Sequence, residues 1–331
     1  MRVATSLAIL CLAAWPAAAQ SGLHDGQPTP PFWSSEWDRT DFQQASVPFI
    51  EIMSGGPPKD GIPAIDDPIF LDSIAEKELP EDEPVVTVRI EGFPARAYPI
   101  RYLTWHEIVN DRFGNRPVTV TFCPLCNSAL VFDGRVDGEE YTFGVSGKLR
   151  FSDMIMYDRQ TESWWQQFNG EGIVGELTGA NLTMIPAWME SWASFKAENP
   201  DGIVMARPGR FRRDYGANPY AGYDSLARPF LYSGDPPPHG IEPLSRVVRV
   251  GDVAWPLSRL AEAGEITEEG VTISWEAGMA SALDRTRISG SRDIGQIRVR
   301  DAVTGADVVH EVVFAFAFHA FEPEGTWMLG E

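Results

Sequence analysis

Short apolar runs separated by turn residues occupy most of the chain from Pro84 onward. Runs of this length, rich in β-branched and aromatic residues, are typical of β-strands. Gly92, Asp133-Gly134 and Asp137-Gly138 supply the turns between them. The pattern predicts strands at Val85–Ile90, Ala95–Ile100, Val118–Phe122, Ala129–Phe132, Glu140–Val145, Met154–Tyr157 and Trp164–Phe168.

Only a few segments have helical spacing of apolar residues. Trp188–Glu198 combines Trp, Phe and Ala at that spacing and stops before Asn199-Pro200, a helix-ending pair. Two shorter helices are expected at Asp72–Leu79 and Leu103–Val109. The fold class that follows is α+β and mainly β, with a few short helices.

An ordered set of matches relates the first strand-rich segment to a later one. Each match is short, but their order along the chain is kept, which predicts two related β-rich units in tandem. The matched pairs are Glu83–Leu103 with Glu242–Leu260, Val118–Phe122 with Val271–Trp275, and Ser128–Leu130 with Ser281–Leu283. In this alignment Cys123, Cys126 and His106 stand opposite Glu276, Met279 and Ala263. The second unit therefore lacks these three residues.

The N-terminus has the pattern of a secretory signal peptide. One Arg precedes the apolar run Val3–Trp15, and Pro-Ala-Ala-Ala stands before Gln20, so cleavage is expected near Ala19. The mature protein is then expected to be soluble and periplasmic or secreted, with no membrane span. The expected organisation is a signal peptide (1–19), an N-terminal arm and covering loop (20–82), a first β-rich unit carrying the site (83–205), an ordered linker (206–241) and a second, degenerate β-rich unit (242–331).

Charge narrows the range of partners. The 331 residues carry a formal net charge of -20, which repels nucleic acids and anionic membranes. The chain contains no dinucleotide-binding fingerprint, so no nucleotide cofactor is expected. A metal ion or a small molecule remains as the expected partner, and the oligomeric state is left open.

The candidate chemistry lies in Cys123-Pro-Leu-Cys-Asn127. The third cysteine, Cys11, falls in the signal peptide, so this pair holds the thiols of the mature protein. A predicted strand leads into Cys123, proline presets a turn, and Asn127 tolerates a left-handed conformation, as in a metal-binding knuckle. A thioredoxin-like site would need a long helix after the pair. The short segment before Asp133-Gly134 disfavours that helix.

Two cysteines alone do not complete a metal site, which usually has three or four protein ligands. His106, on the short helix before the strand to Cys123, is the expected third ligand. A site of His106, Cys123 and Cys126 would suit copper or zinc, in a metal-handling protein or a metalloenzyme. Two alternatives use the same cysteines: a thiol-disulfide redox protein, and a ligand-binding or assembly module with a structural disulfide.

Several motifs together resemble one bacterial family. They are Gly55–Pro63, Ala97–Pro99, Trp105–Asp111, Cys123–Asn127, Phe143–Gly147 and Met156–Trp164. On these motifs most of the mature chain resembles the domain-of-unknown-function 3179 family. The resemblance implies an exported bacterial protein and draws attention to His106, Cys123 and Cys126, but it implies no substrate or reaction.

Overall fold

The computed structural model describes residues 28–330. The predicted signal peptide (1–19) and Cys11 lie outside the described residues. The described chain is mainly β, with five short α-helices, which confirms that part of the predicted fold class. No helix within 28–330 has the length and apolar character needed to cross a membrane.

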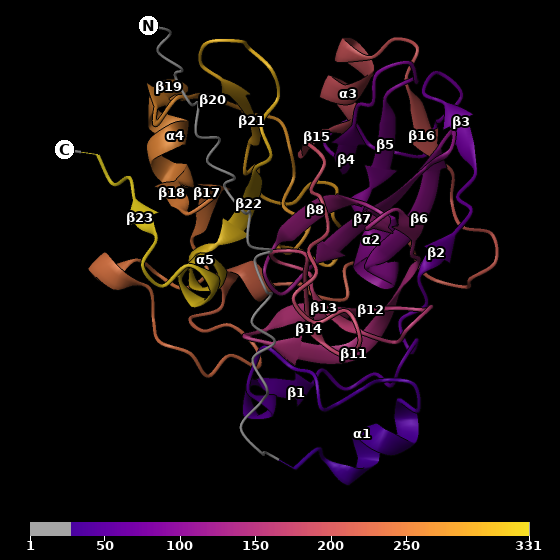
Figure 1. Cartoon of the computed structure of the whole chain (residues 1–331). Coiled ribbons are helices and arrows are strands. Elements are labelled where there is room, and N and C mark those ends of the chain that lie inside the picture. Colours follow the sequence, from indigo (N-terminus) through magenta and orange to yellow (C-terminus); the bar gives the residue numbers. More distant parts are fainter. Residues whose placement is uncertain (1–27, 331) are drawn as a thin grey trace, which may run out of the picture.

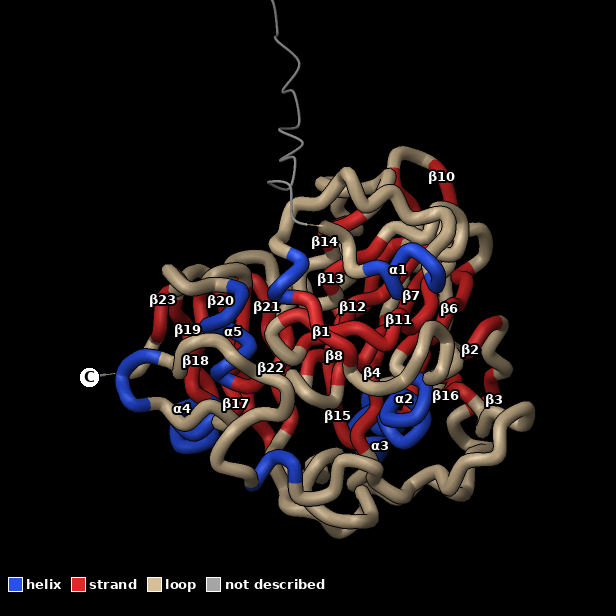
Figure 2. The backbone as a smooth tube through the Cα atoms, turned by 90° about the horizontal axis from the view of Figure 1, so that it is seen from below, coloured by secondary structure: helices blue, strands red, loops and turns tan. Residues whose placement is uncertain are grey.

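Five sheets of three or more strands form a ring that resembles a five-bladed β-propeller (Figures 1 and 2). One sheet contains, in spatial order, β1 (Ile52–Ser54), β11 (Phe143–Arg150), β12 (Asp153–Asp158), β13 (Trp164–Gln166) and β14 (Glu171–Val174). The next contains β2 (Ile65–Asp66), β6 (Ile108–Phe113), β7 (Arg116–Cys123) and β8 (Ser128–Asp133). A third contains β15 (Ala187–Ser191), β4 (Pro84–Val88), β5 (Arg96–Pro99), β16 (Ile203–Met205) and β3 (Phe70–Asp72).

The other two large sheets come from the C-terminal third of the chain. One contains β22 (Glu311–Phe314), β17 (Arg246–Val250), β18 (Val253–Pro256) and β23 (Thr326–Trp327). The other contains β19 (Glu265–Glu268), β20 (Val271–Glu276) and β21 (Gln296–Asp301). A small hairpin is formed by β9 (Arg135–Val136) and β10 (Glu139–Glu140).

The α-helices are short and lie between strands. They are α1 (Pro31–Glu36), α2 (Ile100–His106), α3 (Trp192–Glu198), α4 (Leu257–Ala263) and α5 (Ala315–Phe321). Three 3₁₀ turns, η1 (Phe49–Glu51), η2 (Tyr223–Ser225) and η3 (Pro238–Gly240), complete the regular elements of the described chain. Both α2 and α4 follow a proline, Pro99 and Pro256, whose fixed φ ends the preceding strand and leads into the helix.

The three predicted helices differ from the structure. The helix predicted at Leu103–Val109 is shifted: α2 covers Ile100–His106, and Ile108 and Val109 begin β6. Trp188–Glu198 divides at Ser191: its first half is strand β15, paired with β4, and only its second half is α3. The side chain of Ser191 caps α3 by accepting a hydrogen bond from Ser194 N, 3.2 Å away. Asp72–Leu79 forms the end of β3 and turns instead of a helix. Pairing of Ala187–Ser191 with β4 decided the case of Trp188–Glu198, and a single segment's periodicity does not contain that information.

One strand arrangement occurs twice in the ring. The orders β15-β4-β5-β16 and β22-β17-β18-β23 have the same sequence of antiparallel, antiparallel and parallel pairings. After the helix in each copy, Phe122 N donates to Glu107 O and Trp275 N donates to Gly264 O. These hydrogen bonds agree with the sequence alignment that places Cys123 opposite Glu276 and His106 opposite Ala263.

The two related segments are not separate units in tandem, which corrects that part of the expectation. A single hydrophobic core runs through both of them, from Val86 and Phe122 to Val247 and Phe316. Strand β22 contacts β8, and β15 contacts β21, so strands of each half pack against the other half. Closing a ring of sheets buries the faces that separate units would leave exposed to water.

Candidate metal centre

The segment Cys123–Asn127, called the knuckle below, connects β7 to β8. Cys123 is the last residue of β7, and it pairs with Ser128, the first residue of β8. Asn127 has a φ of 54°, the left-handed conformation expected for it, and its backbone N donates to Pro124 O at 3.3 Å. This tight turn places the thiols of Cys123 and Cys126 on the same side of the sheet end, and both side chains are buried.

Strand β22, from the other half of the chain, is hydrogen-bonded to the knuckle. Phe314 N donates to Cys126 O at 2.9 Å. The side chain of Asn127 donates to Val312 O at 2.7 Å. The backbone of the knuckle is therefore fixed by tertiary hydrogen bonds as well as by its own turn.

Asp153 reaches the cysteines from the β11–β12 hairpin. Arg150 pairs with Asp153, and the two residues between them, Phe151 and Ser152, have φ values of 51° and 66°. Positive φ at both central residues is the signature of a type I′ turn, which favours Asn and Gly and is strained for other residues. The turn also points the Ser152 carbonyl at the thiols, at 3.5 Å from Cys126 Sγ and 3.9 Å from Cys123 Sγ.

Cys123, Cys126 and Asp153 form a compact cluster, the Cys2Asp cluster. One possible ligand atom from each residue lies within 4.8 Å of the other two, and all three side chains are buried. Asp153 Oδ2 accepts hydrogen bonds from Gln166 Nε2 at 2.7 Å and from Phe168 N at 3.0 Å. Asp153 Oδ1 is buried without a hydrogen-bond partner in the described chain. A buried carboxylate oxygen without a partner is costly unless a cation or another donor meets it.

The pKa directions show what burial does to the cluster. Burial raises the pKa of both thiols, that of Cys126 well above its ordinary value. Burial also raises the pKa of Asp153 to about 7. The protein environment alone thus favours uncharged thiols, and it favours the protonated carboxyl group of Asp153 up to a pH of about 7. A bound cation would reverse this preference, because metal ligands bind in their deprotonated forms.

Next to the cluster, a buried ion pair of Arg249 (β17) with Glu311 (β22) is hydrogen-bonded to β8 through Ser128. Ser128 Oγ and Arg249 Nη1 donate to Glu311, at 2.5 Å and 2.6 Å. Arg249 Nη2 also reaches Glu322 Oε1 at 3.2 Å, near the surface. Burial raises the pKa of Glu311, while Arg249 opposes that rise. The negative charge of Glu311 in turn adds to the rise in the pKa of Asp153.

His106 is not brought into this cluster. Its Nδ1 lies 2.7 Å from Pro63 O and its Nε2 lies 2.7 Å from the hydroxyl of Tyr215, so both ring nitrogens have hydrogen-bond partners. Burial lowers the pKa of His106. The structure therefore brings the two predicted cysteines together with Asp153 and leaves the predicted histidine in a structural hydrogen-bond network.

The disulfide of the alternative hypotheses is also not formed. Cys123 and Cys126 are free cysteines in the structure. The sequence signals Asp153 only by the density of polar residues around it. Its proximity to the thiols depends on the ring closing, and no spacing motif signals that.

A cavity of about 330 Å³ borders the cluster. Leu125, between the two cysteines, and Met154, next to Asp153, form part of its wall. The Gly- and Pro-rich loop predicted to cover a site contributes Gly55, Pro57 and Ile62. Further wall residues are Glu107, Val145, Gly147, Lys148, Leu149, Pro219, Tyr220, Phe230 and Leu231.

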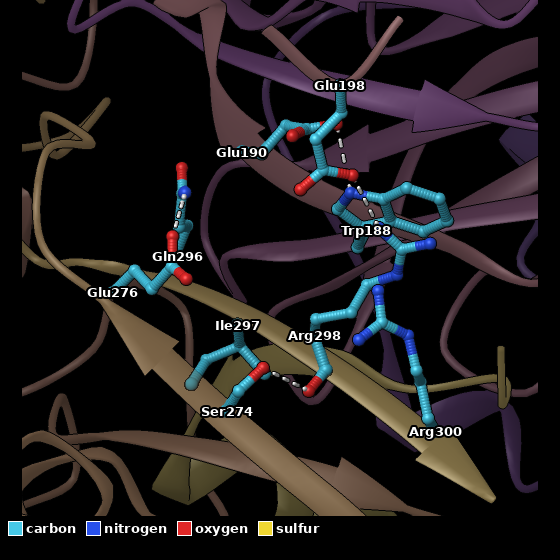
Figure 3. A pocket seen from close by; sticks show the side chains of 9 residues that line it. All are labelled: Trp188, Glu190, Glu198, Ser274, Glu276, Gln296, Ile297, Arg298 and Arg300. Carbon is cyan, nitrogen blue, oxygen red and sulfur yellow. Dashed lines mark hydrogen bonds and ion pairs between the residues drawn. The ribbon is translucent and has the colours of Figure 1, made fainter. Parts of the chain in front are cut away.

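A smaller hollow of about 70 Å³ lies where β20 ends in the related half (Figure 3). Its wall includes Glu276, the residue opposite Cys123 in the alignment. Arg298 stacks on Trp188, 3.4 Å from the ring centre, and pairs with Glu198 at 3.2 Å, while Glu276 accepts a hydrogen bond from Gln296 Nε2 at 3.4 Å. The corresponding strand end thus carries an ion pair and an amide contact in place of a thiol cluster.

The family model described as "Protein of unknown function (DUF3179)" matches residues 59–325. No curated protein and no solved structure matches the chain. The matched range contains the knuckle, Asp153 and most of the ring.

Proposed function

Because the chain belongs to the DUF3179 family, whose description assigns no function, we propose its function from the geometry of the site: a metal-binding protein that holds one ion through Cys123, Cys126 and Asp153. The observation that carries this proposal is the buried carboxylate of Asp153: one of its oxygens lies within 4.8 Å of both sulfurs, and its Oδ1 has no hydrogen-bond partner among residues 28–330. A metal ion would satisfy this oxygen and both thiolates at once.

Zinc fits this set of ligands better than copper. Two thiolates suit both metals, but Cu(I) prefers soft ligands throughout, whereas zinc also accepts a carboxylate oxygen. Three protein ligands leave a fourth tetrahedral position, which is the arrangement of catalytic zinc sites. Zinc bound there would supply a Lewis acid and would lower the pKa of a bound water. The adjoining cavity supports an enzymatic role over storage of the metal.

The thiol-disulfide function is the less favoured use of the same cysteines. Redox-active cysteines are usually accessible and have lowered pKa values. Cys123 and Cys126 are 2% and 0% exposed, and burial raises the pKa of both.

We also propose that the protein works in the periplasm or outside the cell, and the signal-peptide pattern of residues 1–19 supports this location.

Metal analysis of the mature protein tests the proposal. The protein is purified without chelator, reloaded with zinc or with Cu(I) under reducing conditions, and analysed for metal per chain after dialysis. The expected result is about one zinc per chain. Cys123→Ser, Cys126→Ser and Asp153→Asn should each lower zinc retention at least tenfold.

His106→Gln is the matched control, because His106 is buried nearby but lies outside the cluster. It should retain zinc at the wild-type level while losing some stability, since two hydrogen bonds of the ring change. Loss of zinc in His106→Gln with retention in Asp153→Asn would refute the proposed ligand set. Absence of metal from the folded wild-type protein under reducing, zinc-replete conditions would refute the function itself.

A further inference from the structure

The cavity beside the Cys2Asp cluster is mostly apolar. Its wall is built largely from Pro, Val, Leu, Ile, Met and Phe side chains. Phe230 and Leu231 remain 58% and 43% exposed on this wall. Its volume of about 330 Å³ is in the range of small-molecule sites, and such sites are usually apolar with a few placed polar groups.

Glu107 and Tyr220 are the polar side chains that face each other at this wall. The hydroxyl of Tyr220 lies 3.5 Å from Glu107 Oε1, a long hydrogen bond that leaves room for a ligand atom to compete. Glu107 is 8% exposed and takes part in none of the ion pairs formed by residues 28–330. It is therefore a buried carboxyl group without a basic partner.

The backbone gives a second reason to assign Glu107 a role. Its φ is 59°, a conformation that favours glycine, and Gly264 occupies the corresponding place in the related half with a φ of 73°. Each residue accepts the same hydrogen bond, from Phe122 N or from Trp275 N. The fold is thus satisfied by glycine at this place, and a glutamate side chain adds strain and burial without a structural return.

The charges around the cavity favour an uncharged ligand. The basic side chain on the wall, Lys148, directs its ammonium group to Glu36, 3.1 Å away, and to the rings of Trp33, Trp37 and Trp164. An anionic ligand would find no free cation there. A cationic ligand would require Glu107 to ionise, which burial opposes by raising its pKa to about 8.

We infer that this cavity binds a small, uncharged organic molecule with a hydrogen-bond acceptor such as a carbonyl oxygen, and that Glu107 and Tyr220 hold that acceptor. Its chemistry rests on the proposed function, since the metal centre would be the group that acts on the bound molecule. Leu125 and Met154 connect the two sites, because each belongs to the cavity wall and adjoins a residue of the cluster.

Three probes of nearly the same shape and different charge test the inference: benzamide, benzoate and benzamidine. Their dissociation constants are measured by ligand-observed NMR titration on the zinc-loaded mature protein. Benzamide should bind saturably and at least tenfold more tightly than either charged probe. Tyr220→Phe should weaken benzamide binding about three- to tenfold, the effect of one lost hydrogen bond.

Filling the cavity provides the location control. Ile62→Trp, on the wall, should abolish benzamide binding, whereas Ile74→Trp, at a side chain that is 78% exposed, should leave it unchanged. Equal or tighter binding of benzamidine or benzoate, no saturable binding of benzamide, or binding that survives Ile62→Trp would each overturn the inference. Metal content is measured on the same samples. One zinc per chain without benzamide binding refutes the ligand and not the metal centre, and the opposite result refutes the metal centre alone.

Discussion

The ends of β7 and β20 occupy corresponding places in the ring and carry different chemistry. Both strands come after a short helix, and each donates the same backbone hydrogen bond to the residue that follows that helix. At the end of β7 stand the buried thiol of Cys123 and the buried carboxyl group of Asp153. At the end of β20 stands Glu276, which accepts a hydrogen bond from Gln296 in a hollow where Arg298 pairs with Glu198 (Figure 3).

The difference separates what the fold needs from what the site needs. Beside β20, Arg298 and Glu276 each have a polar partner, as polar groups of stable proteins usually do. The groups beside β7 are left with a buried oxygen without a partner, strained residues in a hairpin and a glutamate at a glycine position. Unsatisfied and strained groups that persist in one of two matching places are typical of a functional site.

Removing the metal from the cluster beside β7 should cause one of the largest changes in the free energy of unfolding. Cys126→Ser should lose the part of the free energy of unfolding that depends on zinc, about 4 kcal/mol at a free zinc concentration near 1,000 times the dissociation constant. Denaturant unfolding with and without zinc measures it. Wild-type protein treated with a chelator should match the variant, and zinc-independent stability of the wild type would contradict the prediction.

The buried Arg249–Glu311 ion pair, which is hydrogen-bonded to Ser128 next to the knuckle, should be the next most sensitive point. Glu311→Ala leaves Arg249 without its buried partner, which should cost about 3–5 kcal/mol. Glu322 is the outer partner of the same arginine, and its side chain is 29% exposed. Glu322→Ala should therefore cost about 1 kcal/mol or less. Denaturant unfolding of both variants checks this. Equal losses would show that the inner pair does not fix the knuckle.

The pH dependence of stability should reveal the titration of the Glu107 carboxyl group. Its pKa is raised to about 8 in the folded protein, so folding favours its protonated form. Its stabilising contribution should be complete below about pH 4.3, decline as the pH rises and be lost above about pH 8. Each pKa unit corresponds to about 1.4 kcal/mol. In unfolding measurements from pH 4 to 9 on metal-free protein, Glu107→Gln should be more stable than wild type at pH 9, and the two should converge at pH 4.

The smallest change in stability should come from substitutions at the two corresponding positive-φ residues, Glu107 and Gly264. Gly264→Ala has space for the new methyl group but retains a φ of 73°, so it should lose about 1–2 kcal/mol through backbone strain. Glu107→Gly relieves the same strain and removes a buried carboxyl group. It should therefore be neutral or stabilising. A clear loss of stability in Glu107→Gly would indicate a structural role for the side chain.

The sequence predicted the local features of the site well. Proline and asparagine in Cys123–Asn127 indicated a knuckle, because their backbone preferences act within the turn itself. The preceding strand and the left-handed Asn127 appear in the structure as expected. The internal matches indicated that the strand arrangement repeats, since apolar periodicity is also a local property.

Contacts between distant segments could not be predicted in this way. His106 is near Cys123 in sequence, yet Pro63 and Tyr215 hold its ring, while Asp153 reaches the thiols from a different sheet. Tyr220 approaches Glu107 from the segment 206–241, and Glu311 approaches Ser128 from the other half of the chain.

By itself, the sequence determined the β-rich pattern and the turn of the knuckle with its two thiols. The tertiary structure decided which group joins those thiols, that the two related segments share one core, and that a cavity borders the site. The physical reason is that turn and strand preferences act over a few residues. The cluster and the cavity, in contrast, depend on how five sheets close around a common interior.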